Sequence, residues 1–265
     1  MKGRVLRSTG SFYTVLGDDG RSYDCKVRGK IRLEDLRETN PVAVGDLVVF
    51  QKDSDIGAIT EILPRTNHML RQSVKKSSHA HVLAANVDQV MLIATVAFPR
   101  TSLGFIDRFL VSAEAYRIPQ VLIFNKNDLL DNAARELQHR LIELYEAIAI
   151  TSLSISALEE AHPLIRTLLD KKITLMAGHS GVGKSTLLNK IDPGINQKTA
   201  DISSYSEKGT HTTTFAEMFA IAEDTFIIDT PGVKEWGLAD FNAQELSDYF
   251  PEMRERRLSC KFGSR

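Results

Sequence analysis

A glycine-rich run at residues 178–185 carries the residue types that bind phosphate groups. It reads Gly-His-Ser-Gly-Val-Gly-Lys-Ser, the G-x-x-x-x-G-K-S pattern, between an apolar strand and a helix. Its glycines let backbone N–H groups face an anion, its lysine can reach the β- and γ-phosphates, and its last serine can bind Mg²⁺. The sequence therefore predicts a phosphate-binding loop formed by Gly178, Ser180, Gly181, Val182, Gly183, Lys184, Ser185 and Thr186.

A second motif, Asn-Lys-Asn-Asp, follows an apolar strand and ends at Asp128. The Asp128 carboxylate can accept hydrogen bonds from both N1–H and the N2 amino group of guanine. Adenine has no such pair of donors, so a buried carboxylate would stay unpaired beside it. Asn125 can hold the loop and contact N7 of the base, and the stem of Lys126 can lie against the base plane. This motif predicts guanine rather than adenine.

Ser156 and Ala157 end another strand and resemble the Ser-Ala loop whose backbone N–H meets guanine O6. Alone this dipeptide is a weak signal, but it agrees with the two motifs above. Together the three segments predict GTP and GDP as ligands. The alternative is a P-loop ATPase or small-molecule kinase, and equal turnover of ATP and GTP would favour it.

Two further segments have the composition of nucleotide switches. Asp229 begins an Asp-Thr-Pro-Gly sequence at the end of an apolar strand, so its carboxylate can hold Mg²⁺ through water. The N–H of Gly232 can meet the γ-phosphate. Between this sequence and the phosphate loop lies a Gly-Thr-His-Thr-Thr-Thr run, which must supply the switch threonine that binds Mg²⁺. We favour Thr213, with Thr212 as the alternative.

The residue after Gly232 is Val233, where Ras-like GTPases carry a glutamine that orients the attacking water. Valine cannot do this, so another group must take that role. His211 lies in the switch threonine run and is our candidate, although it could equally be a packed or exposed side chain. The candidate catalytic residues are thus His211, Lys184 and Gly232.

The order of these motifs is circularly permuted. The base motif and the Ser-Ala loop precede the phosphate loop here, whereas they follow it in common GTPases. The same sheet can form if the usual termini are joined between residues 157 and 173, and permutation is tolerated where termini lie close together on the surface. The second switch then leads directly into the C-terminal tail, which could transmit the nucleotide state to that tail.

Alternating strands and helices must position these motifs. Apolar strands at residues 87–94, 120–124, 153–155, 173–177 and 226–228 alternate with helical segments, which is typical of an α/β domain with a mostly parallel sheet. Short strands with turn signals fill residues 1–66 and predict a small all-β barrel, plausibly an OB-fold, with an SH3-like barrel as the alternative. We expect a linker at 67–84, the GTPase domain at 85–236 and a helical region at 237–265.

The composition agrees with a cytoplasmic protein. Of 265 residues, 43% are hydrophobic and 25% charged, and no apolar run is long enough to span a membrane. The two cysteines lie far apart, so a disulfide framework is not expected. The first 80 residues carry 14 Lys and Arg against 10 Asp and Glu, a basic balance that suits nucleic acid or an ordinary solvated surface. No heptad pattern appears, so we expect a monomer.

The combined motifs resemble the RsgA (YjeQ) family of circularly permuted GTPases over nearly the whole chain. This resemblance implies a GTPase that binds the small ribosomal subunit, is stimulated by it and hydrolyses GTP during its late maturation. It also implies an N-terminal OB-fold in contact with rRNA, and neither DNA nor membrane as a partner. The alternative is a GTP-regulated RNA-binding module without ribosome-stimulated hydrolysis.

The resemblance also implies a zinc site in the C-terminal region. Residues 259–262 look like its beginning, and Cys260 is a possible ligand. The other ligands are absent from this sequence, and one cysteine cannot close a zinc site. Residues 237–265 are therefore expected to hold the start of an incomplete zinc-binding domain.

Overall fold

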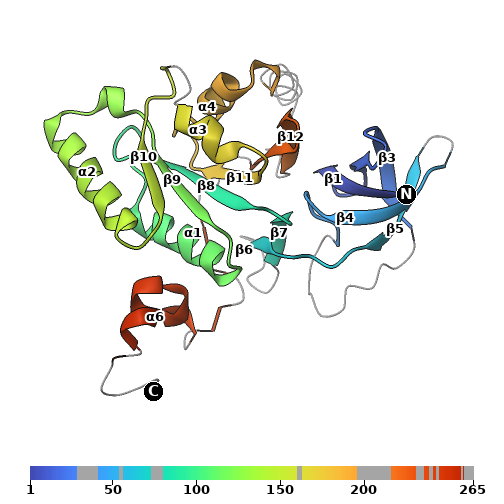
Figure 1. Cartoon of the computed structure of the whole chain (residues 1–265), viewed down its shortest axis with the longest axis horizontal. Coiled ribbons are helices and arrows are strands. Elements are labelled where there is room, and N and C mark those ends of the chain that lie inside the picture. Colours follow the sequence, from blue (N-terminus) through green and yellow to red (C-terminus); the bar gives the residue numbers. More distant parts are fainter. Residues whose placement is uncertain are drawn as a thin grey trace.

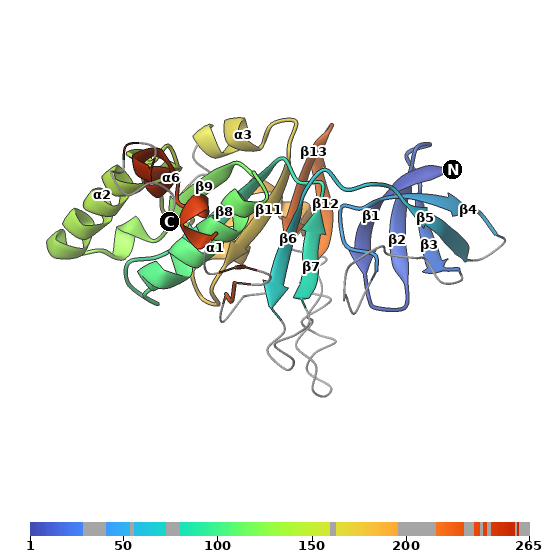
Figure 2. The same cartoon turned by 90° about the horizontal axis from the view of Figure 1, so that it is seen from below.

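A β-barrel and an α/β domain lie at opposite ends of the chain's computed structural model (Figure 1). The structure describes residues 1–28, 41–53, 56–72, 80–159, 163–195, 216–230, 236–238, 241–242, 245–257 and 259. The view turned by 90° shows helices on both sides of the central sheet (Figure 2). Among the described residues, no helix is long and apolar enough to cross a membrane.

Five strands form the N-terminal barrel: β1 (Lys2–Ser8), β2 (Tyr13–Gly17), β3 (Ser22–Val27), β4 (Leu47–Gln51) and β5 (Gly57–Ile62). They pair in the order β1-β2-β3-β5-β4, and β4 pairs back onto β1, which closes the barrel. The β3–β5 pair is parallel and the others are antiparallel. This arrangement confirms the expected OB-like barrel and removes the free strand edges of an open sheet.

Alternate side chains of these strands fill the barrel. Val5, Val15, Phe50 and Ile59 are fully buried there, as the alternating pattern requires. The thiol of Cys25 lies in the same cluster, and burial raises its pKa to about 11. This cysteine therefore stays protonated at neutral pH, which makes it a poor metal ligand.

The α/β domain is built on a six-stranded part of the same continuous sheet, in the order β10-β9-β8-β11-β13-β12. Its parallel strands are β8 (Gln89–Ala94), β9 (Gln120–Phe124), β10 (Thr151–Ser154), β11 (Ile173–Gly178) and β13 (Thr225–Asp229). Strand β12 (Glu217–Ala222) pairs antiparallel with β13 and was not expected from the sequence. The mostly parallel α/β prediction is confirmed.

Two hydrophobic clusters cover the two faces of this sheet. Helices α1 (Leu103–Ala115) and α2 (Asn132–Glu146) pack on one face, while α3 (Pro163–Leu169) and α4 (Lys184–Ile191) pack on the other. Strand β8 shows the division, because Leu92 faces the first cluster and Met91 and Ile93 face the second. A strand buried on both faces reads as a continuous apolar run, which is why the sequence located it.

The segment expected as a linker contains a hairpin of β6 (His68–Gln72) and β7 (Ala80–Ala85). Met69 and Ala84 are fully buried in the cluster under α1, so this hairpin packs on the GTPase domain. The alternation of apolar and polar residues in these two strands is weak, because polar residues interrupt it. Tertiary packing therefore decides their structure.

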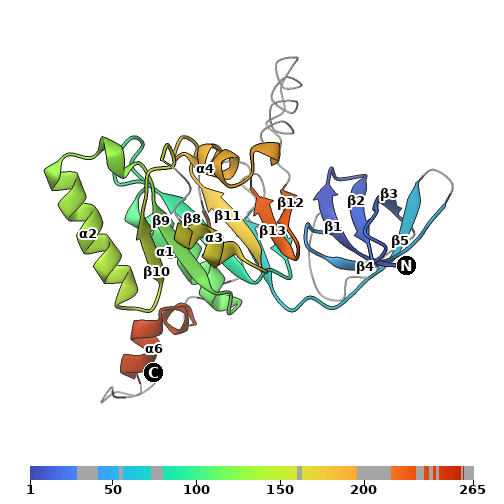
Figure 3. The ribbon, with the colours of Figure 1, turned by 45° about the horizontal axis from the view of Figure 1, so that its top comes forward.

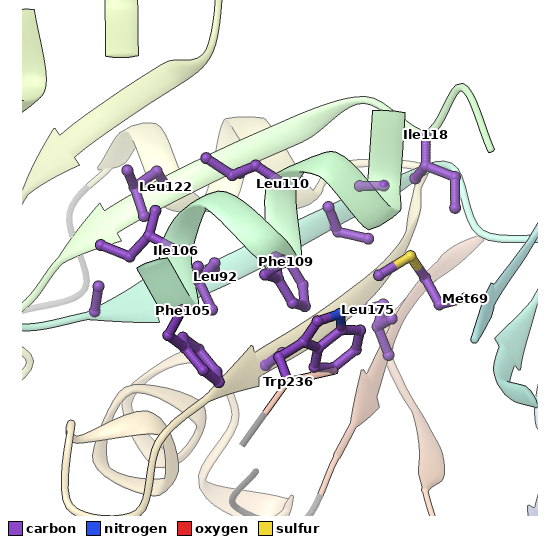
Figure 4. Packing of buried hydrophobic residues seen from close by; sticks show 14 of the residues in the cluster. Met69, Leu92, Phe105, Ile106, Phe109, Leu110, Ile118, Leu122, Leu175 and Trp236 are labelled. Atoms are coloured by element: carbon purple, nitrogen blue, oxygen red, sulfur yellow. The ribbon is translucent and has the colours of Figure 1, made fainter. Parts of the chain in front are cut away.

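Beyond residue 230 the described chain resumes at Trp236, which packs against α1. Trp236 is buried, its Nε1 donates to Ser112 Oγ over 2.9 Å, and its carbonyl oxygen accepts from Arg108 Nε over 2.7 Å. The indole ring meets the Phe109 ring edge-on at 4.8 Å between centroids (Figure 4). A short 3₁₀ turn, η2 (Leu246–Tyr249), and α6 (Pro251–Arg257) follow, and α6 lies away from the barrel (Figure 3).

A buried ion pair joins the barrel to the chain that leaves it. The Asp46 carboxylate is fully buried and accepts from Arg65 Nε at 2.7 Å, from Arg65 Nη2 at 2.8 Å and from the Ala43 N–H at 2.8 Å. The adjacent Gly45 has φ +91°, and a Cβ there would lie 2.0 Å from the Ala85 carbonyl oxygen. The junction therefore requires both the ion pair and glycine's missing side chain.

We expect Arg65→Ala to lower the free energy of unfolding by about 3 kcal/mol, because it leaves a buried carboxylate without its cation. Chemical denaturation followed by circular dichroism measures this. The matched control is Arg140→Ala, whose partner Glu136 is 3.8 Å away and whose side chain is 66% exposed. The control should lose less than about 0.5 kcal/mol. Equal losses in the two variants would show that the Asp46 pair does not stabilise the junction.

Candidate functional site

The phosphate loop joins β11 to α4 on the edge of the sheet where the parallel strands end. No described side chain caps α4, whose N-cap is Gly183 at φ +93°. Its first N–H groups are therefore left for an anion, as at other phosphate-binding helix ends. A Cβ on Gly183 would lie 2.2 Å from Asn125 Nδ2, so only glycine fits here. The strand–loop–helix context predicted for residues 178–185 is confirmed.

The side chain of Asn125 joins the three guanine-nucleotide motifs. It is almost fully buried, its Nδ2 donates to the Val182 carbonyl oxygen at 2.8 Å, and its Oδ1 accepts from the Ala157 N–H at 2.8 Å. The base motif, the phosphate loop and the Ser-Ala loop are thus held together by one amide. We expected Asn125 to hold its own loop, whereas the two hydrogen bonds of its side chain go to two other loops.

The rest of the base motif is arranged around this amide. Lys126 adopts the left-handed conformation with φ 65°, and its Nζ donates to the Phe98 carbonyl oxygen at 2.5 Å. Asp128 lies in a 3₁₀ turn, η1 (Asn127–Leu129), and is an exposed residue. Ser156 is buried close by, in the loop that follows β10. An exposed carboxylate beside buried loop residues can accept from a planar ligand that has paired donors.

An ion pair marks the phosphate end of the site. Lys184 Nζ contacts Asp229 Oδ1, and the register of β11 with β13 places Asp229 beside Met176. Lys184 is buried, whereas the Asp229 side chain is 20% exposed. Thr230 is fixed next to it, because its Oγ1 donates to the Met176 carbonyl oxygen at 3.0 Å. Two residues far apart in sequence thus meet where the β- and γ-phosphates are expected.

The donor set at this end fits Mg²⁺. Ser185 offers an exposed hydroxyl group in the first turn of α4, and Asp229 offers a partly exposed carboxylate. Oxygen ligands of this kind, few in number, suit a Mg²⁺ ion that keeps water and nucleotide phosphates as its other ligands. Among the described residues, no group of three or more His, Cys, Asp or Glu side chains could hold a metal ion.

Several expected site residues lie outside the described residues. These are the catalytic candidates His211 and Gly232, the magnesium candidate Thr213 with its alternative Thr212, and the possible zinc ligand Cys260. Their roles remain predictions.

The sequence reasoning missed one neighbour of the site, the loop at the carboxyl end of β8. Phe98 accepts the Lys126 hydrogen bond, and Pro99 Cδ would lie 3.5 Å from a Cβ placed on Gly181. Its position after a buried parallel strand was the available signal, because ligands bind outside the carboxyl ends of such strands. A separate cavity of about 770 Å³ lies between α1, the end of α2 and the C-terminal segment, and none of the motif residues lines it.

Comparison with known families covers both parts of the chain. The RsgA N-terminal domain family model matches residues 2–59, and the RsgA GTPase family model matches residues 62–239.

Relatives match along the full length of this chain. A Bacteroides fragilis protein named small ribosomal subunit biogenesis GTPase RsgA is 48% identical over 100% of this chain and 86% of its own. The protein of the same name in Flavobacterium johnsoniae is 43% identical, with 100% and 83% covered.

Solved structures agree with the sequence relatives. YjeQ from Thermotoga maritima superposes with a TM-score of 0.73 at 33% identity, and the match covers 95% of this chain and 81% of that one. YloQ, described as a circularly permuted GTPase, gives a TM-score of 0.71 at 29% identity, with 100% and 82% covered. The permuted motif order, the OB-like barrel and these matches together show that the chain belongs to the RsgA family of GTPases.

Proposed function

We propose that this protein binds the small ribosomal subunit and hydrolyses GTP to GDP and phosphate during the late maturation of that subunit. The main structural support for guanine-nucleotide binding is the Asn125 side chain, which holds the base motif against the phosphate loop and the Ser-Ala loop. The ribosomal partner is supported by the names of full-length relatives at 43–48% identity. Such a protein acts in the cytoplasm, where subunits are assembled, and we expect it to work as a monomer.

Each residue of the site has a role in this proposal. Asp128 selects guanine, and the stem of Lys126 lies against the base. Lys184 places its positive charge on the β- and γ-phosphates, where negative charge develops as the bond to the γ-phosphate breaks. In binding the nucleotide, Lys184 exchanges its contact with Asp229 for phosphate oxygens.

The same exchange frees Asp229 for the metal. We infer that Ser185, Asp229 and Thr213 hold Mg²⁺, which, when bound, neutralises charge on the phosphates. Gly232 donates its N–H to the γ-phosphate, and His211 orients the attacking water because Val233 cannot. The support for the last two roles is their place in the sequence motifs.

The barrel is the RNA-binding part in this proposal, with residues 1–66 as its domain. OB-folds bind oligonucleotides on the β2–β3 face and the β1–β2 loop. In that loop Phe12 is 45% exposed, and Lys26 Nζ of β3 lies 4.4 Å from the centroid of its ring. An exposed aromatic ring beside a cation is suited to stacking on an unpaired base next to phosphates.

The zinc site that the family resemblance implies is incomplete in the sequence. Cys260 is the cysteine of the C-terminal region, and the other cysteine, Cys25, is buried in the barrel with a raised pKa. A tetrahedral structural site needs four ligands, so these two cysteines do not fit the metal.

Isolated small ribosomal subunits should stimulate GTP turnover by the purified protein, and ATP should not be hydrolysed under the same conditions. Phosphate release with and without subunits measures this, and large subunits serve as the control partner. Turnover of GTP that subunits leave unchanged would contradict the assembly role and leave a GTP-binding module. Equal turnover of ATP would contradict the guanine site itself.

We expect Lys184→Ala to reduce GTP turnover by about 10²-fold, because one preorganised positive charge on the transferred phosphoryl group is lost. Single-turnover hydrolysis measures this. Lys190→Ala removes an exposed lysine from the other end of the same helix and is the matched control. The assigned role would be wrong if both variants kept the rate of the unaltered protein.

Asn125→Ala should weaken GDP binding by about 30-fold, because it removes two buried hydrogen bonds worth about 1 kcal/mol each. Titration calorimetry with GDP and Mg²⁺ gives the affinity. Asn127→Ala, in the same motif, loses only a long 3.4 Å contact to Ser154 Oγ and is the control. Similar GDP affinities in the two variants would show that the Asn125 amide does not organise the site.

A further inference from the structure

A short loop of residues 95–101 connects β8 to α1 beside the nucleotide motifs. Two threonines at its base close it. The Thr101 N–H donates to the Thr95 carbonyl oxygen at 2.8 Å, and the Thr95 N–H donates to Thr101 Oγ1 at 3.1 Å. Thr95 Oγ1 also donates to the Pro99 carbonyl oxygen, and both threonines are almost fully buried. The tip of the loop is therefore held in place by its own base.

This tip contacts two of the guanine-nucleotide motifs. Lys126 Nζ of the base motif donates to the Phe98 carbonyl oxygen at 2.5 Å, and Pro99 lies next to Gly181 of the phosphate loop. Lys126 itself reaches back toward the phosphate loop, since a Cβ on Gly183 would lie 3.9 Å from Lys126 Cε. The loop thus fixes the position of the lysine that separates the base end of the site from its phosphate end.

The Phe98 side chain is unusual in two respects. It is 66% exposed, the second most exposed of the large hydrophobic side chains that the structure describes, and its backbone is left-handed with φ 55°. A non-glycine residue in this conformation costs free energy and persists where its surroundings hold it. Here the Lys126 hydrogen bond holds the Phe98 carbonyl oxygen and the two threonines close the loop, so the backbone that carries the ring is fixed.

We propose that Phe98 contacts the sugar of the bound guanine nucleotide and that the loop at residues 95–101 is a wall of the nucleoside pocket. This inference rests on the nucleotide site proposed above. A nucleotide whose base is held by Asp128 and whose phosphates are held by Lys184 must pass Lys126 with its ribose. The Phe98 carbonyl oxygen lies 2.5 Å from Lys126 Nζ, so the backbone that carries the exposed phenyl ring lies beside the lysine that the ribose passes.

The physical gain is burial of apolar surface on both partners. The ring loses part of its exposed surface against the sugar. The Lys126 side chain is already held by the Phe98 carbonyl oxygen, so less side-chain freedom is lost on binding. Phe98 is then an affinity determinant for the nucleoside, and it acts on GTP and GDP alike because both nucleotides carry the same ribose.

The test is titration calorimetry of unlabelled GDP with Mg²⁺, since a label on the ribose would occupy the proposed contact. We expect Phe98→Ala to weaken GDP binding about fivefold and Phe98→Leu to weaken it about twofold, in line with loss of an aromatic contact. Leu144→Ala removes another exposed apolar side chain, 58% exposed on α2, and should leave GDP affinity unchanged. Thermal unfolding without nucleotide should be the same for Phe98→Ala and Phe98→Leu.

Unchanged GDP affinity in Phe98→Ala would overturn this inference while leaving the nucleotide site intact. Unchanged GDP affinity with a loss of subunit-stimulated GTP turnover would instead place Phe98 against the ribosomal subunit. Absence of GDP binding by the unaltered protein would overturn both the nucleotide site and the role of Phe98. A graded loss of GDP affinity would confirm the contact, with Phe98→Ala binding more weakly than Phe98→Leu and the Leu144→Ala control unaffected.

Discussion

The buried amide of Asn125 is the constraint on which the candidate site depends. A primary amide has a donor at one end and an acceptor at the other, and here each end holds a different loop through a backbone group at 2.8 Å. Glycine at position 183 makes room for it, because any Cβ there would overlap the amide nitrogen. The base-recognition loops therefore cannot shift independently of the phosphate loop.

The parallel sheet provides the frame for that amide. Strands β8, β9, β10, β11 and β13 run in one direction, so their carboxyl ends lie at a single edge of the sheet. The spatial order of these strands, not their order along the chain, decides which loops meet. Circular permutation changes the connections at the opposite side and the points of attachment of the barrel and tail. It leaves the nucleotide-binding edge unchanged.

Helix α1 extends this arrangement away from the sheet. Its first turn carries Phe105, whose ring lies 3.9 Å from the His179 ring of the phosphate loop. Farther along, Phe109 and Ser112 contact Trp236, which follows the second switch motif (Figure 4). One helix thus touches both the phosphate loop and the chain that leads into the C-terminal region. Packing contacts along α1 therefore connect the phosphate loop with Trp236 at the start of the C-terminal segment.

The motifs, the guanine preference, the permuted order, the OB-like barrel and the α/β class could all be predicted from the amino-acid sequence. These depend on local spacing, such as an apolar strand followed directly by its functional loop, and on regular alternation of buried positions. Tertiary packing was needed to reveal the hairpin within residues 67–84, the pairing of β12 at the sheet and the hydrogen bond from Lys126 to the Phe98 carbonyl oxygen. It also decided the partners of Asn125, which lie 57 and 32 residues away in sequence. Contacts over such distances follow from how whole elements pack, and hydrophobic periodicity along one segment carries no information about them.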